Sequence, residues 1–221
     1  MLEATGLVKA FGKTPALTGI SVAVGEGEIV AVTGPSGSGK STLLHCLAGI
    51  IRPESGQVTY AGTRIDTLEE AALTKLRRTS FGVVFQFGEL VPELSALENV
   101  ALPLLFNRRG RQESTSLAGK WLTRFGVADC ADRRPGELSG GQSQRVAVAR
   151  ALITGPRVIF ADEPTGALDS RAGEQVMNAL LDSARDTGAA VVLVTHDNRV
   201  AAYADREIML RDGAVLTGVP R

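Results

Sequence analysis

One stretch of the chain, Gly34 to Thr42, constrains the possible folds more than any other. It reads Gly-Pro-Ser-Gly-Ser-Gly-Lys-Ser-Thr, follows the apolar run Ile29–Val32 and leads into a segment of helical composition, Lys40–Ile50. Glycines in such a loop let the backbone wrap closely around a phosphate chain, and the loop N–H groups and the helix N-terminus point at negative charge. The order strand, glycine-rich loop, helix therefore predicts an α/β protein that binds a nucleotide.

Within this loop, two residues have predicted chemical roles. Lys40 supplies a mobile cation for the β- and γ-phosphates, and the Ser41 hydroxyl is placed to ligate Mg²⁺. A Gly/Ser-rich loop can match this pattern by chance, but the strand before it and the helix after it argue against chance. The predicted nucleotide contacts are Gly34, Pro35, Ser36, Gly37, Ser38, Gly39, Lys40, Ser41 and Thr42.

Along the rest of the chain, apolar strands alternate with helices. Strands are expected at Leu2–Val8, Ile20–Val24, Glu28–Val32, Gly56–Tyr60, Phe81–Gln86, Arg157–Ala161 and Ala189–Thr195. Helices are expected at 66–78, Leu97–Phe106, Thr115–Phe125, Gly140–Ile153 and Ser170–Asp186, the last ending at Gly188. This alternation predicts a mainly parallel sheet covered on both faces. The helical stretch at about 88–154 is interpreted as a subdomain inserted into a core made of 1–87 and 155–221, all within one domain of 1–221.

Two adjacent carboxylates end the apolar strand Val158–Ala161. Asp162, at the strand end, is placed to help hold the water shell of Mg²⁺. Glu163 follows directly and can act as general base for the water that attacks the γ-phosphate. Taken alone, an Asp-Glu pair after a strand is more often a solvated loop start. The phosphate-binding loop in the same chain favours the catalytic interpretation.

The pentapeptide Leu138–Gln142, Leu-Ser-Gly-Gly-Gln, precedes another predicted helix. Its glycines and the helix N-terminus offer a second anion site, although in isolation they would predict only a helix cap. Here the sequence resembles the ATP-binding-cassette (ABC) ATPase family, which has this pentapeptide as its signature. The resemblance implies that ATP is contacted by Ser139, Gly140, Gly141 and Gln142.

Further residues match family elements, and the resemblance runs from about residue 2 to residue 212. It implies that Gln86 reaches Mg²⁺ and the water, and that His196 contacts the γ-phosphate. It also implies that Phe11 stacks on adenine, where the family often has tyrosine. Gly166 to Asp169 is similar to the family's D-loop, with Gly166 where serine is usual, and adds Asp169 to the nucleotide contacts. The implied fold is an α/β P-loop cassette with an antiparallel β portion near the N-terminus.

The stretches Phe85–Val100 and Ala161–Asp169 resemble one subgroup of the family. That subgroup contains ATPases of macrolide and antimicrobial-peptide export and resistance, lipoprotein release and cell division. The resemblance implies an ATP-hydrolysing subunit that dimerises head to tail on ATP and drives a separate membrane permease, of export or mechanotransmission type. Its permease contact is expected at about Phe87–Leu97, although these apolar residues could simply pack the helical subdomain.

Composition sets further limits on partners and location. Lys plus Arg and Asp plus Glu number 24 each, so the net charge of zero gives no reason to expect a nucleic-acid partner. No stretch approaches the roughly 18 apolar residues that cross a bilayer, and no signal peptide is visible. We therefore expect a cytoplasmic protein, held at the cytoplasmic face of a membrane by another subunit. Cys46 and Cys130 are expected to be reduced thiols.

Two competing function classes are disfavoured. Soluble ABC ATPases of DNA repair, chromosome organisation or translation would show long coiled-coil insertions or tandem cassettes, and this sequence has neither. An unrelated P-loop kinase or GTPase would lack Leu138–Gln142 and the combination of Glu163 with His196.

Overall fold

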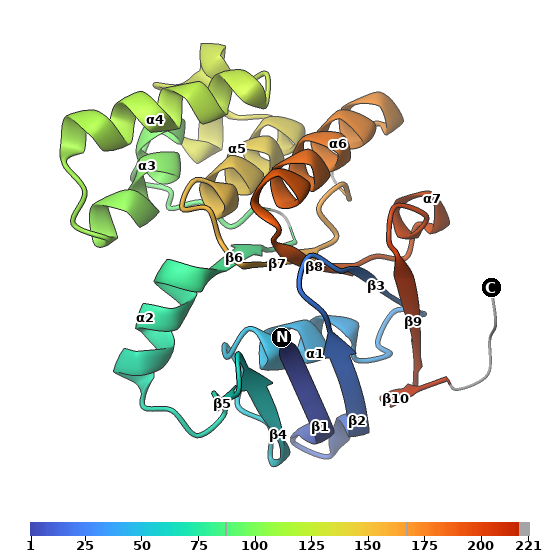
Figure 1. Ribbon diagram of the computed structural model, residues 1–221. Coiled ribbons are helices and arrows are strands. Elements are labelled where there is room, and N and C mark those ends of the chain that lie inside the picture. The colour runs from blue at the N-terminus through green and yellow to red at the C-terminus, as the bar shows by residue number, and fades with distance from the viewer. Residues whose placement is uncertain (87, 167, 217–221) are drawn as a thin grey trace. The chain divides into compact units, whose positions relative to one another are not determined.

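The computed structural model describes residues 1–86, 88–166 and 168–216 (Figure 1). The chain forms two compact units: Met1–Arg77 together with the described residues from Ala190 onward, and Arg78–Ala189. The helical subdomain expected at about 88–154 lies within the second unit, and its boundaries stay a prediction. No helix among the described residues is long and apolar enough to span a membrane.

The first unit contains an antiparallel sheet in the order β2-β1-β4-β5. Its strands are β1 (Leu2–Phe11), β2 (Thr14–Val24), β4 (Ser55–Tyr60) and β5 (Thr63–Arg64). Strands were expected at Leu2–Val8 and Ile20–Val24, and both are longer than expected. The reason is that β1 and β2 form one hairpin whose pairing continues to Phe11 opposite Thr14.

The same unit contains a second group of strands in the order β10-β9-β3-β8, in which only β10 runs antiparallel to its neighbour. They are β3 (Ile29–Thr33), β8 (Ala190–Val194), β9 (Arg206–Arg211) and β10 (Ala214–Val215). β3 pairs in parallel with both β8 and β9, and every residue of β3 and β8 is buried, as in sheets covered on both faces. Helix α1 (Lys40–Leu47) follows β3 and contacts β1, β2 and β8, while the short α7 (Asn198–Ala201) contacts β3.

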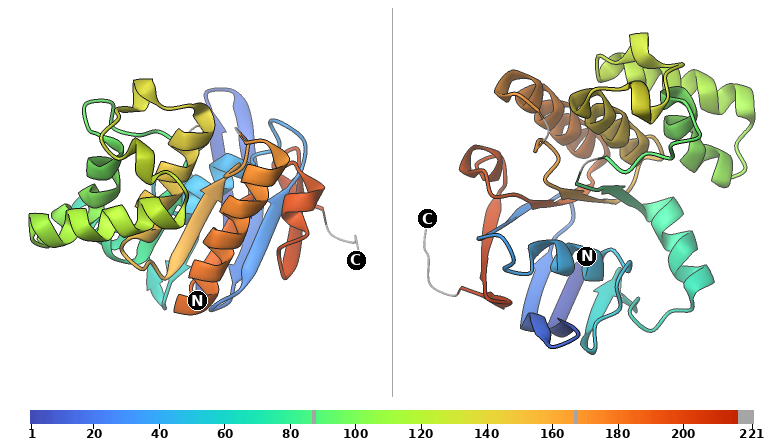
Figure 2. Two further views of the ribbon diagram at one scale, coloured as in Figure 1. Left: turned by 90° about the horizontal axis from the view of Figure 1, so that it is seen from above. Right: turned by 180° about the vertical axis from the view of Figure 1, so that it is seen from behind.

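The second unit combines two parallel strands with a group of helices (Figure 2). The strands are β6 (Phe81–Val84) and β7 (Val158–Asp162), joined on their buried face by an edge-to-face contact of Phe81 and Phe160. The helices are α3 (Ala96–Phe106), α4 (Arg111–Arg124), α5 (Gly140–Leu152) and α6 (Ser170–Thr187), with 3₁₀ turns η1 (Ala128–Cys130) and η2 (Pro135–Glu137). α5 packs on β6 and contacts all three of the other helices.

The expected α/β class and the main elements are confirmed. Helix α2 (Glu70–Ser80) falls at the expected place, and Gly188 ends α6 in the left-handed conformation, with a φ of 67°. The sequence patterns did not predict β5, α7, β9 or β10. These elements are short, and β9 has only two buried residues, Ile208 and Leu210.

Candidate functional site

Two positions in the loop after β3 admit only glycine. Gly34 has a φ of 141°, and a Cβ there would lie 2.1 Å from the carbonyl oxygen of Leu210 on β9. Gly39 has a φ of 97°, and a Cβ there would lie 2.3 Å from the carbonyl oxygen of Ala16 on β2. A side chain at either position would clash with neighbouring backbone, and the left-handed conformation there also favours glycine. The loop is therefore held in a tight curl between β9 and β2.

Lys40 places its ammonium group inside this curl. Its Nζ donates to the carbonyl oxygens of Gly34 and Pro35, each at 2.8 Å, and the side chain is almost fully buried. The N-cap of α1 is Gly39, which has no side chain to bond the free N–H groups. The first turn of the helix, with Ser41 and Thr42, carries no acidic residue. An uncapped helix N-terminus beside a buried cation is a strong site for phosphate.

His196 follows β8 at the same edge of the parallel strands as this loop. Val194 pairs with Val32, and the Thr195 N–H donates to the Val32 carbonyl oxygen at 3.2 Å, so both strands deliver their next residues to one edge. The His196 side chain is exposed. Asp197 beside it caps α7 and accepts hydrogen bonds from Arg199, which lower the pKa of the Asp197 carboxyl below its ordinary value.

Phe11 ends β1 in the same unit with 52% of its surface exposed. The ammonium of Lys9 lies 5.6 Å from the centre of the ring. An exposed aromatic face beside a cation suits the stacking expected for adenine.

In the second unit, the carboxyl ends of β6 and β7 carry three of the predicted residues. Gln86 follows β6, Asp162 is the last residue of β7, and Glu163 comes directly after it. These strands are parallel, with Val84 opposite Ala161, so the three residues share one edge. Asp162 is buried, while Gln86 is exposed and Glu163 half-buried. Glu163 has a φ of 47°, a conformation that costs on the order of 1–3 kcal/mol for a residue with a side chain and that clusters at functional sites.

Ser139 and Gln142 cap the N-terminus of α5 for each other. The Gln142 N–H donates to Ser139 Oγ at 3.2 Å, and the Ser139 N–H donates to Gln142 Oε1 at 2.9 Å. This reciprocal pair leaves Gly140 and Gly141 in a first turn without acidic residues. Two of the predicted nucleotide contacts therefore also start the helix.

Asp169 has a similar structural role on α6, where its Oδ1 accepts the Ala172 N–H at 2.9 Å. Its nucleotide contact stays a prediction. Ala167 of the expected D-loop lies outside the described residues.

Two residues that the sequence analysis missed fix the loop after Gln86. The Nη2 of Arg150 on α5 donates to the carbonyl oxygens of Gly88 and Glu89 at 3.1 and 3.0 Å. Asn99, fully buried on α3, binds the loop segment 91–95 through four side-chain hydrogen bonds. Asn99 and Arg150 are each a polar residue within a largely apolar stretch of a helix, and this pattern could have drawn attention to them.

The apolar stretch expected to contact a permease belongs to this same loop. Phe87 lies outside the described residues. The other apolar members are half-buried rather than fully exposed: Leu90, Val91, Leu94 and Leu97.

The donors predicted for Mg²⁺ are oxygen atoms, which this ion prefers. No group of three or more His, Cys, Asp or Glu residues in the described part of the chain forms a metal cage. The hydroxyl of Ser41, in the first unit, and the carboxylate of Asp162, in the second, are each a ligand type that Mg²⁺ accepts beside phosphates and water.

The predicted residues are divided between the two units. The first unit holds the loop Gly34–Lys40 (the Lys40 loop), His196 and Phe11. The second holds the strand-end set Gln86, Asp162 and Glu163, and the two capped helix starts at Ser139 and Asp169.

Comparisons with known proteins give one consistent family. A family model described as "ABC transporter" matches residues 17–166. The lipoprotein-releasing system ATP-binding protein LolD of Geobacter metallireducens is 43% identical over 98% of this chain and 98% of its own length. The macrolide export ATP-binding/permease protein MacB of Rhodopseudomonas palustris is 48% identical over 91% of this chain and 30% of its own length.

The chain spans about a third of two relatives named ATP-binding/permease proteins: MacB, and the probable syringafactin export protein SyfD of Pseudomonas syringae, where it covers 34% at 44% identity. Among solved structures, the ATP-binding cassette MJ0796, described as a dimer in a post-hydrolysis state bound to ADP and Pi, matches with a TM-score of 0.92. That match has 42% identity and covers 97% of this chain and 96% of that one.

Proposed function

This chain belongs to the ABC transporter family, and from that premise we propose that it is an ATP-hydrolysing subunit that drives a separate membrane permease in export or mechanotransmission. The observation that carries the proposal is the Lys40 loop. Its ammonium group, its uncapped helix N-terminus and its two obligatory glycines form a site for a nucleotide's phosphate chain. Relatives named for lipoprotein release and macrolide export support the export assignment.

Each predicted residue has a step in the proposed hydrolysis. Lys40 and the N–H groups of the first turn of α1 bind the β- and γ-phosphates and neutralise their charge. Glu163 accepts the proton from the attacking water, Gln86 orients that water, and His196 hydrogen-bonds the γ-phosphate. The left-handed backbone at Glu163 turns the chain at the end of β7, and such conformations cluster at functional sites, which supports Glu163 as the base.

Magnesium is the second proposed cofactor beside ATP. Ser41, Asp162 and Gln86 would hold it, directly or through water. Mg²⁺ held there would act as a Lewis acid and neutralise negative charge that develops on the phosphates.

We propose that two copies of the chain complete each site. In this head-to-tail homodimer, the N–H groups of Gly140 and Gly141 and the hydroxyl of Ser139 bind the γ-phosphate held by the partner's Lys40 loop. The phosphate charge then joins the two chains, and hydrolysis releases them. The solved relative MJ0796, itself described as dimeric, supports this arrangement.

The permease contact is proposed for about Phe87–Leu97. This segment follows Gln86 directly, and Arg150 and Asn99 tie it to α5 and α3. A movement of Gln86 would therefore be transmitted through this loop to α5, the helix that Ser139 caps. In this arrangement the protein is peripheral on the cytoplasmic face of the membrane, and no nucleic-acid partner is involved.

Replacing the proposed base tests the mechanism. Glu163→Gln removes the proton acceptor but keeps the shape, so turnover should fall by about 10²–10⁴-fold while ATP binding remains. The variant should then accumulate as an ATP-bound dimer in size-exclusion chromatography. Glu174→Gln, the same change on the exposed surface of α6, is the control and should hydrolyse ATP at the normal rate. Normal turnover in Glu163→Gln would remove Glu163 from the mechanism.

A further inference from the structure

Two adjacent apolar side chains are exposed where α3 ends. Leu105 is 36% and Phe106 is 59% exposed, and the other large apolar side chains exposed in the described chain, at Phe11, Ile50 and Leu216, are well separated in sequence. Neither residue is used by the proposed nucleotide site. An exposed apolar pair at a helix end is a common feature of contact surfaces.

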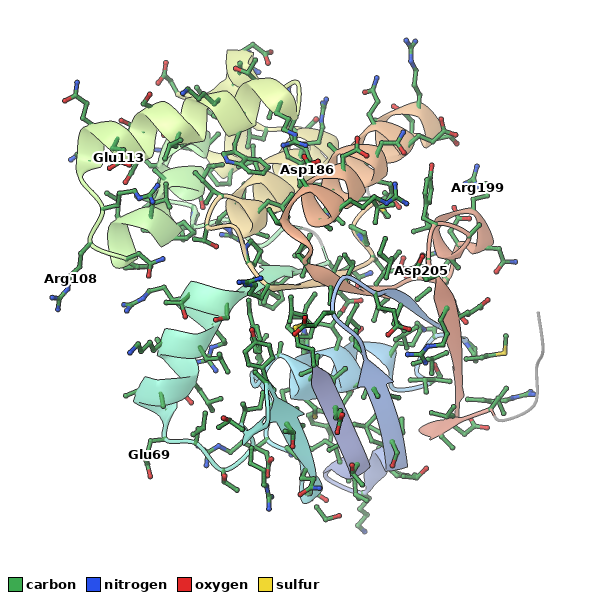
Figure 3. The ribbon with its side chains drawn as sticks, viewed as in Figure 1. Glu69, Arg108, Glu113, Asp186, Arg199 and Asp205 are labelled. Atoms are coloured by element: carbon green, nitrogen blue, oxygen red, sulfur yellow. The ribbon has the colours of Figure 1, made fainter. Side chains whose placement is uncertain are left out.

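Arginines lie next to this pair. Arg108, Arg109 and Arg111 follow it in the chain, and all three are exposed. Arg78 is also exposed and lies beside the turn, because the Asn107 side chain donates to its carbonyl oxygen at 3.2 Å. Figure 3 shows the Arg108 side chain directed away from the neighbouring helices. We call Arg78 and Leu105–Arg111 the α3 tip.

Acidic neighbours cancel only part of this charge. Glu113 pairs with Arg109 at 3.6 Å and Glu98 pairs with Arg111 at 3.7 Å, and both pairs are long and exposed. Arg108 makes no ion pair with any described residue. Four arginines against two glutamates leave the α3 tip positive on a chain whose overall net charge is zero.

The backbone at Arg108 favours a different residue. The Arg109 N–H donates to the Leu104 carbonyl oxygen and the Arg108 N–H to that of Leu105, which is the Schellman arrangement that ends helices. Arg108 occupies its left-handed position with a φ of 61°, where glycine is usual. An arginine held there at a conformational cost indicates that its side chain has a use at this turn.

We propose that the α3 tip binds an anionic phospholipid surface. Phe106 and Leu105 would enter the headgroup layer, and the guanidinium groups would bind lipid phosphates, which their planar donors match well. The inference extends the proposed function, because it supplies a lipid contact for a chain that is otherwise held at the membrane only by the permease. A basic cluster with an apolar pair fits a lipid surface better than an acidic protein segment, which needs no exposed phenylalanine.

Vesicle flotation with the purified full chain tests this contact without any permease. Binding is expected to vesicles of phosphatidylcholine with phosphatidylglycerol, to fall with rising salt, and to be absent with phosphatidylcholine alone. Each basic residue near an anionic leaflet contributes about a factor of five, so Arg108→Glu should weaken binding on the order of 25-fold. Arg185→Glu, the same charge reversal at an exposed site on α6, is the matched control and should change binding little.

Arg108→Gly separates the lipid role from a structural one. Glycine relieves the left-handed backbone, so thermal stability should rise while vesicle binding falls about fivefold. If Arg108 serves only to end the helix, stability rises and vesicle binding stays unchanged, which overturns the inference.

The apolar pair has its own readout. A polarity-sensitive fluorophore is attached to Phe106→Cys and, as the control, to Ile50→Cys. Its emission should shift to the blue on anionic vesicles only at position 106. Native Cys46 and Cys130 are buried, and burial raises the pKa of the Cys46 thiol to about 11, so labelling is selective.

Failure of this inference is distinct from failure of the proposed function. A preparation that hydrolyses ATP but does not float with anionic vesicles overturns the lipid contact alone. α3-tip variants that bind vesicles normally yet lose co-purification with the permease would instead identify the tip as a protein-docking surface. Vesicle binding by a chain that hydrolyses no ATP would leave the lipid contact standing and refute the enzyme assignment.

Discussion

Replacing Asn99 by leucine should destabilise the chain and release the loop that follows Gln86. The Asn99 amide is fully buried on α3. It accepts the Val91 N–H at 2.8 Å and donates to the carbonyl oxygens of Val91, Leu94 and Ser95 at 3.0, 3.2 and 3.1 Å. Leucine has a similar size but none of these polar atoms, so the change tests the hydrogen bonds rather than the packing.

The expected magnitude follows from which partners are left unpaired. The Val91 carbonyl oxygen keeps the Leu94 N–H, and the Ser95 carbonyl oxygen keeps the Asn99 N–H. Only the Val91 N–H and the Leu94 carbonyl oxygen lose their partners. At about 1–3 kcal/mol for each unsatisfied group, less where water enters, the free energy of unfolding should fall by about 2–4 kcal/mol.

Urea unfolding measures this loss. The single tryptophan, Trp121, reports on it because α4 packs on α3. A glutamate-specific protease should also cut the variant faster at Glu89 or Glu93. The control is Asn107→Leu at the end of the same helix, where one exposed bond of 3.2 Å is lost and less than about 1 kcal/mol is expected. A loss below about 0.5 kcal/mol for Asn99→Leu, with unchanged proteolysis, would refute the anchoring role.

Three more predictions each concern the hydrogen bonding of one residue. Gln144 is buried with both amide atoms lacking hydrogen-bond partners in the described structure, so Gln144→Met should raise the free energy of unfolding by about 1–2 kcal/mol in urea titrations. Ser139→Asp keeps an N-cap, so the urea midpoint should hold, but it places negative charge at the proposed γ-phosphate site, so ATPase activity should be lost. The hydrogen bond from Arg206 lowers the pKa of Glu28 below its ordinary value, although burial partly opposes it. A lowered folded pKa gives stability that is present above the unfolded pKa and is lost as pH falls through the folded one, so Arg206→Met should cost more stability at pH 6 than at pH 3.

Much of the candidate site could be predicted because its chemistry is local in sequence. An apolar run long enough to be a buried strand precedes Gly34, Asp162 and His196 in turn. Each polar residue then falls at a strand's carboxyl end, where short sequence patterns are sufficient to place it. The structure therefore has these features at the predicted places: the Lys40 loop after β3, the acid pair at the end of β7, and Ser139 at the start of α5.

The contacts that position the site are distant in sequence and left no such pattern. Thr33 donates to Glu207 across 174 positions at 2.7 Å, and Arg150 reaches Gly88 across 62. β9 supplies the carbonyl oxygen that excludes a side chain at Gly34, yet its alternation is too short to predict. Spacing along the chain shows which residues are chemically suited to a site, whereas these pairings depend on how strands and helices meet.

The hydrogen bonds that start the two helices explain why Ser139 and Asp169 differ as predicted nucleotide contacts. Ser139 Oγ accepts the Gln142 N–H, and a hydroxyl still has a proton to donate, so this residue can cap α5 and bind phosphate together. Asp169 is acceptor-only when ionised, and one of its oxygens already accepts the Ala172 N–H. Its charge would repel a phosphate, so any nucleotide contact of Asp169 must go through water or through a donor on the second chain. Gly39, the N-cap of α1, differs from both: it has no side chain, so it leaves the N–H groups of the first turn free for a phosphate.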